Sequence, residues 1–254
     1  MKPLLIDLDG VLKIGNSPSP DVKELFGFIE VNKLPACILS NSTLRTSELV
    51  SEFFNSHIIE LKIPAITAFD AALSYVKKNY RKVSVYCRDY LLHHFNGMID
   101  EENPEAIVIG DIADKWNYRI INDIFKKVLA GADLVAMHKN KYWNPYGELL
   151  IDAGAFITGV EFASNKEAIL IGKPSANFFK AALEKINCNI EKGFFMIGDD
   201  IENDILAAQM IGGTGILIYT GKTKFTPDST VSKIPNYEAH SLKEVISIIQ
   251  KEFL

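Results

Sequence analysis

The chain is poor in cysteine, and its cysteines form no pattern that would build a site. Cys37, Cys87 and Cys188 are scattered along 254 residues and include no CxxC pair. An odd, dispersed set of this kind is typical of reduced thiols in a protein core, and it argues against a disulfide framework or a zinc site. We therefore expect a cytoplasmic protein.

The sequence also lacks long apolar runs, a basic excess and low-complexity segments. No stretch approaches the ~18 apolar residues of a membrane span, and Asp7 interrupts the short apolar start of the chain, which argues against a signal peptide. The net charge of −5 argues against a nucleic-acid-binding surface. We expect neither nucleic acid nor membrane as a partner, and the ordinary share of apolar residues, 48%, predicts a globular fold.

Short apolar runs alternate with helix-like stretches along the chain. Residues 21–31, 117–131 and 241–254 each place apolar side chains on one helical face, and strand-like runs separate such stretches. This alternation predicts an α/β fold with a parallel sheet covered on both faces. The strand-like runs occupy residues 4–8, 36–40, 83–87, 106–110, 133–137, 168–172, 194–198 and 215–219.

Two of these runs end in carboxylates. "LLIDLDG" places Asp7 and Asp9 before a glycine, and "FFMIGDDIENDI" places Asp199 directly after an apolar run, with Asp204 following. Turn formation and helix capping explain each run separately. If the two strands are neighbours, the carboxylates converge, and oxygen donors without nearby cysteine or histidine suit Mg²⁺.

Two further runs end in groups that bind anions. "ILSNST" supplies hydroxyl and amide donors at Ser40 and Asn41, directly before a helix-like stretch, and "LIGKPS" places Lys173 after another apolar run. Capping and a solvated lysine are the simple alternatives. Together, the four strand ends hold the parts needed to bind and transfer a phosphoryl group, and one shared site explains them better than four independent caps.

The motifs "DLDGVL", "LSNST", "GKP" and "GDDIENDI" occur in the order of the four motifs of the haloacid dehalogenase superfamily, which the chain resembles over nearly its whole length. The stretch between "SNST" and "GKP" is similar to the C2-type cap of the NagD-like subfamily IIA. "HKNKYW" and "DAGAFITGVEFAS" resemble the branch of the phospholysine/phosphohistidine/inorganic pyrophosphate phosphatase and its haloacid dehalogenase-like domain-containing 2 relative. The resemblance implies a Rossmann-like core with a doubly wound parallel sheet at 1–70 and 166–254, and an inserted α/β cap at 71–165.

The resemblance also implies a role for each carboxylate. Asp7 would be the nucleophile that forms an aspartyl-phosphate, and Asp9 would act first as general acid and then as general base. Asp7, the backbone carbonyl of Asp9 and Asp199 would hold Mg²⁺, and Asp204 would support it directly or through water. An aspartate at the position of Asp9 favours a phosphatase over the family's dehalogenases.

The remaining core motifs would bind the phosphoryl group. Ser40 would donate a hydrogen bond to its oxygens, with help from the backbone near Asn41, and Lys173 would offset negative charge. In the cap, the candidate substrate residues are polar or aromatic: Trp116, His138, Lys139 and Tyr146. The alternative is that the tryptophan packs the cap interior and the polar groups are solvated.

The function implied is a Mg²⁺-dependent phosphohydrolase of small phosphorylated compounds. Sugar phosphates, nucleotides, pyrophosphate and phosphoamino acids stay open as substrates. The alternative is a phosphate-binding or regulatory protein, or a phosphotransferase, with the same site and little hydrolytic turnover. Cap-to-cap and core-to-core homodimers occur among similar proteins, so a homodimer also stays open.

Overall fold

The computed structural model describes residues 2–143, 150–223 and 235–252, and it divides the chain into two compact units. The core unit comprises Met1–Ser40, Ser47–Ile66 and Lys173–Leu254. The inserted unit comprises Asn41–Thr46 and Thr67–Gly172. Both are built on mainly parallel sheets with helices, so the predicted fold, a Rossmann-like core with an inserted α/β cap, is confirmed. The units change at 66/67 and 172/173, and the boundaries drawn from the sequence after residues 70 and 165 stay a prediction.

The core unit contains a six-stranded sheet in the order β14-β13-β12-β1-β4-β5. Strand β1 pairs in parallel with β12 on one side and with β4 on the other. The chain therefore first builds the sheet outward from β1 in one direction and later in the opposite direction, which places β1 at a topological switch point. In open α/β sheets, ligands bind at the carboxyl ends of the strands beside such a point. The strands are β1 (Leu4–Ile6), β4 (Ala36–Ser40), β5 (Ala65–Thr67), β12 (Phe195–Gly198), β13 (Thr214–Ile218) and β14 (Tyr237–Ala239).

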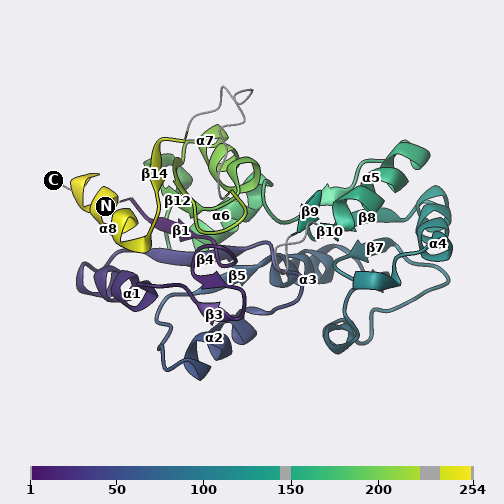
Figure 1. Ribbon diagram of the computed structural model, residues 1–254. Coiled ribbons are helices and arrows are strands. Elements are labelled where there is room, and N and C mark those ends of the chain that lie inside the picture. The colour runs from purple at the N-terminus through teal and green to yellow at the C-terminus, as the bar shows by residue number, and fades with distance from the viewer. Residues whose placement is uncertain (1, 144–149, 224–234, 253–254) are drawn as a thin grey trace. The chain divides into compact units, whose positions relative to one another are not determined.

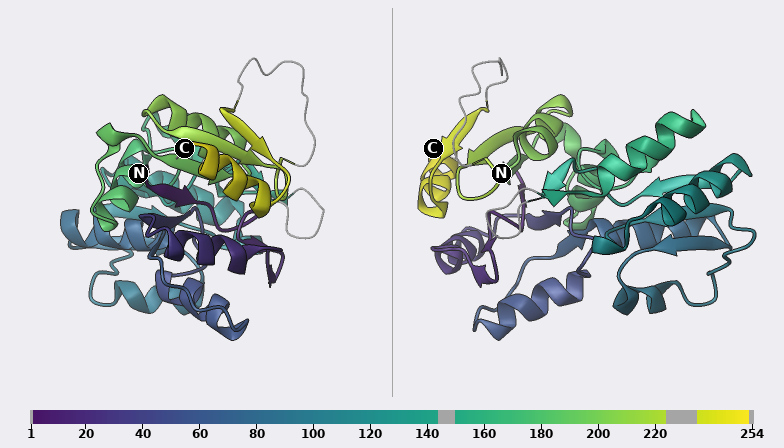
Figure 2. Two further views of the ribbon diagram at one scale, coloured as in Figure 1. Left: turned by 90° about the vertical axis from the view of Figure 1, so that its left-hand side faces the viewer. Right: turned by 45° about the vertical axis from the view of Figure 1, so that its right-hand side comes forward.

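Helices cover the core sheet on both faces, as Figures 1 and 2 show. Side chains of a strand alternate between the faces, so Leu4 and Ile6 join the apolar cluster with α1, α2 and α8, while Leu5 points the other way. Helix α6 contacts β1 and β4. The helices are α1 (Val22–Val31), α2 (Ser47–Ser56), α6 (Ala176–Lys185), the 3₁₀ turn η3 (Ile190–Lys192), the π-helical segment η4 (Ile201–Leu206), α7 (Ala207–Met210) and α8 (Leu242–Glu252), beside a small hairpin of β2 (Lys13–Ile14) and β3 (Ser17–Pro18).

The inserted unit contains a four-stranded sheet in the order β11-β8-β7-β6 and a separate antiparallel hairpin of β9 and β10. Helices α4 and α5 pack together, and their apolar side chains form one cluster with those of β7 and β8. The strands are β6 (Val83–Tyr86), β7 (Ala106–Ile109), β8 (Asp133–Ala136), β9 (Tyr142–Trp143), β10 (Leu150–Ile151) and β11 (Ile169–Leu170). The helices are α3 (Ala68–Asn79), α4 (Tyr118–Leu129) and α5 (Ala153–Ser164), with the 3₁₀ turns η1 (Asp89–Phe95) and η2 (Ala113–Lys115). None of the described helices combines the length and the apolar character that crossing a bilayer requires.

Candidate active site

Three buried carboxylates lie together at the carboxyl edge of the core sheet. Asp7 follows β1, Asp199 follows β12, and Asp204 lies in η4. Because β1 and β12 are adjacent and parallel, with Ile6 opposite Ile197, the residues that follow them emerge side by side. One oxygen of each carboxylate lies within 4.8 Å of the others. The convergence expected from the sequence is therefore present in the structure.

Lys173 lies among these carboxylates. Its Nζ is 2.6 Å from Oδ1 of Asp7, to which it donates a hydrogen bond, and 2.6 Å from Oδ1 of Asp204. The lysine is only 3% exposed. The strand that precedes it, β11, belongs to the sheet of the inserted unit, whereas Asp7 and Asp199 follow strands of the core sheet. Lys173 itself begins the third segment of the core unit.

The buried cluster carries an excess of negative charge. Burial raises the pKa of Asp7 well above its ordinary value, and Asp204 and Asp199 add to the rise against the opposing effect of Lys173. Burial, followed by the neighbouring Asp204, raises the pKa of Asp199 to about 7, and burial also raises the pKa of Asp204. Burial alone would lower the pKa of Lys173, but Asp204 and Asp7 outweigh it and raise this pKa. One ammonium therefore faces three carboxylates that resist full ionisation.

The donor set of this cluster fits a hard divalent cation. All three acidic groups offer oxygen, and neither cysteine nor histidine is part of the group. With every group ionised, three carboxylates and one ammonium leave two uncompensated negative charges, which a divalent cation would neutralise. Mg²⁺ takes oxygen ligands and is held by few carboxylates together with water and substrate phosphate. Asp7, Asp199 and Asp204 are the residues that could hold it.

Asp9 is not one of the three clustered carboxylates. Its side chain is 54% exposed, and its Oδ1 lies 2.8 Å from Nζ of Lys13, which donates a hydrogen bond to it. The Lys13 side chain is itself largely buried and lies over the ring of Phe53. The contact between a metal and the backbone carbonyl of Asp9, and the acid–base role of its carboxylate, stay predictions.

Ser40 and Asn41 fall on either side of a unit boundary. Ser40 is the buried last residue of β4, the strand that pairs with β1. Asn41 begins the short segment that belongs to the inserted unit, where its Nδ2 lies 3.5 Å from Oδ1 of Asn140. Ser40 thus lies at the sheet edge that also carries Asp7. Phosphate binding by either residue stays a prediction.

A turn after β13 touches the cluster and was not predicted from the sequence. The backbone N–H of Lys222 donates a hydrogen bond to Oδ2 of Asp199, and the side-chain Nζ of Lys222 lies 2.6 Å from Oδ2 of Asp200. Oγ1 of Thr220 donates to the carbonyl oxygen of Gly10 over 2.6 Å. The sequence does contain a pattern that could have predicted it. "YTGK" places polar groups at the end of a strand-like run, as the four motifs do.

Two of the candidate cap residues have partners inside the inserted unit. The ring of Trp116 stacks on that of Phe156, with centroids 4.6 Å apart, and packs against the cluster of α4 and α5. Nζ of Lys139 forms an ion pair of 2.6 Å with Glu161. Tyr146 lies outside the described residues. Trp116 and Lys139 therefore each have a role in the packing of the inserted unit. Their contact with a substrate stays a prediction.

The third candidate, His138, is buried two residues after the end of β8. Its Nδ1 accepts a hydrogen bond from the backbone N–H of Asn140 over 3.1 Å, and its Nε2 lies 3.8 Å from Oδ1 of Asp152. Asp152 also accepts a hydrogen bond from Ala153 at the start of α5. The acceptor role of Nδ1 places the proton of a neutral ring on Nε2, facing Asp152. His138 therefore links β8 to the start of α5, and a role in substrate binding stays a prediction.

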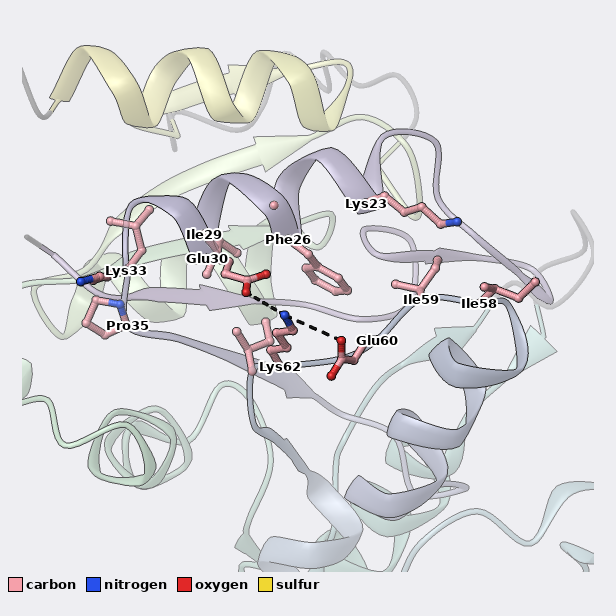
Figure 3. Close-up of a pocket in the computed structure, with 13 residues that line it drawn as sticks. Lys23, Phe26, Ile29, Glu30, Lys33, Pro35, Ile58, Ile59, Glu60 and Lys62 are labelled. Atoms are coloured by element: carbon pink, nitrogen blue, oxygen red, sulfur yellow. Dashed lines mark hydrogen bonds and ion pairs between the residues drawn. The ribbon is translucent and has the colours of Figure 1, made fainter.

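A groove in the core unit is lined by none of the residues named above (Figure 3). Its volume is about 560 Å³, and it is lined by α1 and by the segments that precede β4 and β5. Lys62 crosses it with ion pairs of 2.7 Å to Glu30 and 3.7 Å to Glu60, as the dashed lines in Figure 3 mark. These segments lie at the amino ends of their strands, whereas the carboxylate cluster lies at the carboxyl ends. The groove is therefore not part of the candidate site.

Comparisons of the sequence with family models and curated proteins agree on one family. A model described as "Haloacid dehalogenase-like hydrolase" matches residues 4–98, and one described as "HAD-hyrolase-like" matches residues 170–245. The chain is 29% identical over 255 residues to the mouse (Mus musculus) haloacid dehalogenase-like hydrolase domain-containing protein 2, covering 100% of this chain and 98% of the relative. It is 28% identical over 236 residues to the zebrafish (Danio rerio) phospholysine phosphohistidine inorganic pyrophosphate phosphatase, covering 87% and 84%.

Solved structures share the fold over almost the whole chain. The p-nitrophenyl phosphatase from Archaeoglobus fulgidus superposes with a TM-score of 0.85 at 21% identity, covering 97% of this chain and 98% of the other. NagD from E. coli K-12 superposes with a TM-score of 0.82 at 24% identity, covering 96% and 98%. At these identities, the likeness establishes the architecture alone.

Proposed function

Because this chain belongs to the haloacid dehalogenase superfamily, in its NagD-like subfamily IIA, we propose that it is a phosphatase that hydrolyses small phosphorylated compounds. The proposal includes Mg²⁺ as cofactor and an aspartyl-phosphate intermediate on Asp7. The observation that carries it is the buried cluster in which Lys173 lies 2.6 Å from both Asp7 and Asp204, beside Asp199. Capping and turn formation alone do not require three carboxylates to be buried together.

In the first half of the reaction, a carboxylate oxygen of Asp7 attacks the phosphorus atom of the substrate. The bond from phosphorus to the leaving oxygen breaks, and Asp9 gives its proton to that oxygen. Lys173, already within hydrogen-bonding distance of Asp7, favours the ionised form of the nucleophile and offsets the charge of the incoming phosphate. Mg²⁺ held by Asp7, Asp199 and Asp204 would act as a Lewis acid toward the phosphoryl oxygens.

In the second half, water attacks the phosphorus atom of the aspartyl-phosphate. Asp9, now ionised, takes a proton from that water, and the bond between phosphorus and the Asp7 oxygen breaks. Inorganic phosphate leaves and the free Asp7 carboxylate is restored. Ser40, at the end of the strand next to β1, donates a hydrogen bond to the phosphoryl oxygens in both halves.

The substrate class follows less directly than the chemistry. One curated relative is named for phospholysine, phosphohistidine and inorganic pyrophosphate, and one structural neighbour for p-nitrophenyl phosphate. We propose these four compounds, together with sugar phosphates and nucleotides, as the substrate panel. Substrate choice is assigned to the inserted unit, where His138 and Lys139 lie after β8.

The first experiment is hydrolysis of p-nitrophenyl phosphate by the full chain with Mg²⁺, with EDTA, and with the Asp7→Asn variant. Turnover that needs both Mg²⁺ and Asp7 supports the proposal. Turnover that persists in EDTA or in Asp7→Asn contradicts it. If this aryl phosphate is not hydrolysed, the rest of the panel is assayed in the same three arms, and failure on every compound contradicts the proposal.

Acid quenching of a short reaction with ³²P-labelled substrate tests the intermediate. A labelled, hydroxylamine-sensitive protein that is absent in Asp7→Asn supports an acyl phosphate on Asp7. Added acceptor alcohols distinguish hydrolysis from phosphotransfer, since a transferase yields the alcohol phosphate in place of inorganic phosphate.

A further inference from the structure

The turn at Thr220–Lys222 joins the ends of three strands of the core sheet. It follows β13, and its contacts reach the residue after β12 and the loop after β1. The N–H of Lys222 donates to the Asp199 carboxylate, the N–H of Thr223 donates to the Asp199 carbonyl over 3.2 Å, and the Thr220 hydroxyl donates to the Gly10 carbonyl over 2.6 Å. None of these contacts is explained by the proposed chemical steps.

Two glycines allow these segments to approach so closely. A Cβ atom on Gly10 or on Gly221 would overlap the carboxylate of Asp199. Gly10 also has a φ of +90°, which favours glycine. The Asp199 carboxylate is therefore enclosed by backbone from both sides, and its orientation depends on where the turn lies.

The side chain of Lys222 connects the turn to Asp200, the residue that follows Asp199. Its Nζ lies 2.6 Å from Oδ2 of Asp200, a carboxylate that is only 16% exposed. Asp200 also accepts hydrogen bonds from the N–H groups of Glu202 and Asn203 at the start of η4. The N–H of Asp200 in turn donates to Oδ2 of Asp204 over 3.2 Å. A continuous set of contacts thus leads from Lys222 to both Asp199 and Asp204.

We propose that the Thr220–Lys222 turn is a clamp that sets the positions of Asp199 and Asp204 for cation binding, with Lys222 as a positioning residue. The inference rests on the proposed function, because it takes these carboxylates as Mg²⁺ ligands. The Lys222 contacts given above go to Asp199 and Asp200, and the role assigned to it is to position the metal ligands. Groups that orient metal ligands typically contribute about 10- to 100-fold to metal affinity.

The test is Mg²⁺ binding by the full chain in the absence of substrate, measured by isothermal titration calorimetry. Lys222→Met keeps the length of the side chain but removes the ion pair to Asp200, and we expect the dissociation constant for Mg²⁺ to rise about 10-fold or more. Lys222→Arg should largely restore it. Lys243→Met is the matched control, since Lys243 pairs with Asp21 and Glu24 on the exposed surface of the same unit.

Two further readouts separate the clamp from a purely structural role. The unfolding temperature in EDTA reports folding without the cation, and the Mg²⁺ concentration for half-maximal activity should rise more than the KM for substrate. If Lys222→Met lowers the unfolding temperature but binds Mg²⁺ as the wild type does, the clamp is overturned. Thr220→Val, which removes only the hydroxyl bond to Gly10, provides a milder second variant and should also weaken Mg²⁺ binding.

The outcome also distinguishes this inference from the proposed function. If the wild type binds Mg²⁺, Asp199→Asn does not, and both Lys222→Met and Thr220→Val match the wild type, only the clamp fails. If the wild type binds no Mg²⁺, or Asp199→Asn binds as the wild type does, the proposed metal site fails and the clamp fails with it.

Discussion

The core unit and the inserted unit each contain a lysine between two carboxylates, but the carboxylates are buried in the core unit and exposed to water in the inserted unit. In the inserted unit, Nζ of Lys127 lies 2.7 Å from Glu101 and 2.9 Å from Asp123, and it donates to the hydroxyls of Ser84 and Tyr86. The two carboxylates are open to water, with Asp123 50% exposed. Although partial burial acts to raise it, the pKa of Asp123 is lowered by the hydrogen bond from Tyr86 and by Lys127.

In the core unit, Lys173 has the same short distances to two carboxylates, but none of the groups reaches water freely. Asp7 and Asp204 are buried, and a third buried carboxylate, Asp199, lies beside them. Burial raises the pKa of all three, the reverse of the shift at the inserted unit's Asp123. A hydrated network of balanced charges stabilises a fold. An excess of buried charge, in contrast, raises the free energy of the folded state unless a ligand of opposite charge neutralises it. The five changes below test this difference.

The largest effect is expected for Asp7→Asn. The amide cannot act as the nucleophile, so hydrolysis should fall by about 10⁴-fold or more, while the amide keeps the volume of the side chain. Asp123→Asn is the matched control in the inserted unit and should leave kcat near that of the wild type. The measurement is steady-state hydrolysis with Mg²⁺. Activity above about 1% in Asp7→Asn would remove its assignment as nucleophile.

Asp9→Asn should follow, with a loss of about 10²- to 10⁴-fold, the range for a general acid–base group. Asp9 is exposed and forms an ion pair with a lysine, as Asp123 does. This variant therefore tests whether an exposed, lysine-paired carboxylate can still take part in catalysis. Rapid-quench kinetics should show that both the formation and the hydrolysis of the phosphoenzyme slow. Unchanged turnover would show that Asp9, like Asp123, serves only as the partner of a lysine in a surface ion pair.

Lys173→Met should lower kcat by about 10²- to 10³-fold, the range for removal of a charge-stabilising donor. Phosphate binding should weaken as well, because its negative charge is no longer offset. The readouts are kcat, KM and the inhibition constant of inorganic phosphate. Wild-type values for all three would show that Lys173, despite its burial, acts only in folding.

Lys127→Met should show the opposite pattern, with wild-type kcat and a loss of about 1–3 kcal/mol in the free energy of unfolding. Four polar partners lose their shared donor, but three of them can be hydrated at the surface. Urea denaturation followed by circular dichroism measures the change. A large loss of activity without a loss of stability would contradict the structural reading of this network.

The smallest effect is a dependence of stability on pH in the metal-free protein. Since the pKa of Asp199 rises from 3.8 to about 7 on folding, the folded state keeps a proton that the unfolded state releases between these values. Stability in EDTA should therefore fall as pH rises from about 4 to 7. Asp7 and Asp204 shift in the same direction.

Thermal unfolding at pH 5 and pH 8, with EDTA or Mg²⁺, checks this dependence. Mg²⁺ should restore stability at pH 8, because a cation can take the place of the bound proton, and Asp199→Asn should reduce the pH dependence. A metal-free protein that becomes more stable between pH 5 and pH 8 would show that the cluster does not hold its protons.

Much of the core site could be predicted from the sequence because strand ends follow from local patterns. The runs that end at Asp7, Ser40 and Asp199 form neighbouring parallel strands, so their carboxyl ends share an edge. The helix-like stretch predicted at 241–254 contains α8, and Ser241 caps its start by accepting a hydrogen bond from the N–H of Glu244. Strand-like runs and helix-like stretches are both recognised from residues close together in the chain.

The features that were not predicted from the sequence depend on how strands pair. The strand before Lys173 is too short to reveal which sheet it joins, and it pairs with β8 of the inserted unit. The ion pair of Asp9 with Lys13 depends on the hairpin of β2 and β3, whose two-residue strands leave no periodic pattern. The contact of Lys222 with Asp199 spans 23 residues and depends on the order of β12 and β13 in the sheet.

The alternation of strands and helices, the order of the motifs and the chemical types of the site residues follow from local pattern and composition, so they are readable before the chain folds. The tertiary structure decided which carboxylates share a site and which are left to pair at the surface. The physical reason is that burial and distance control the energy of a charge. Both arise only when strands far apart in the sequence, such as those that precede Asp7 and Asp199, pair in one sheet.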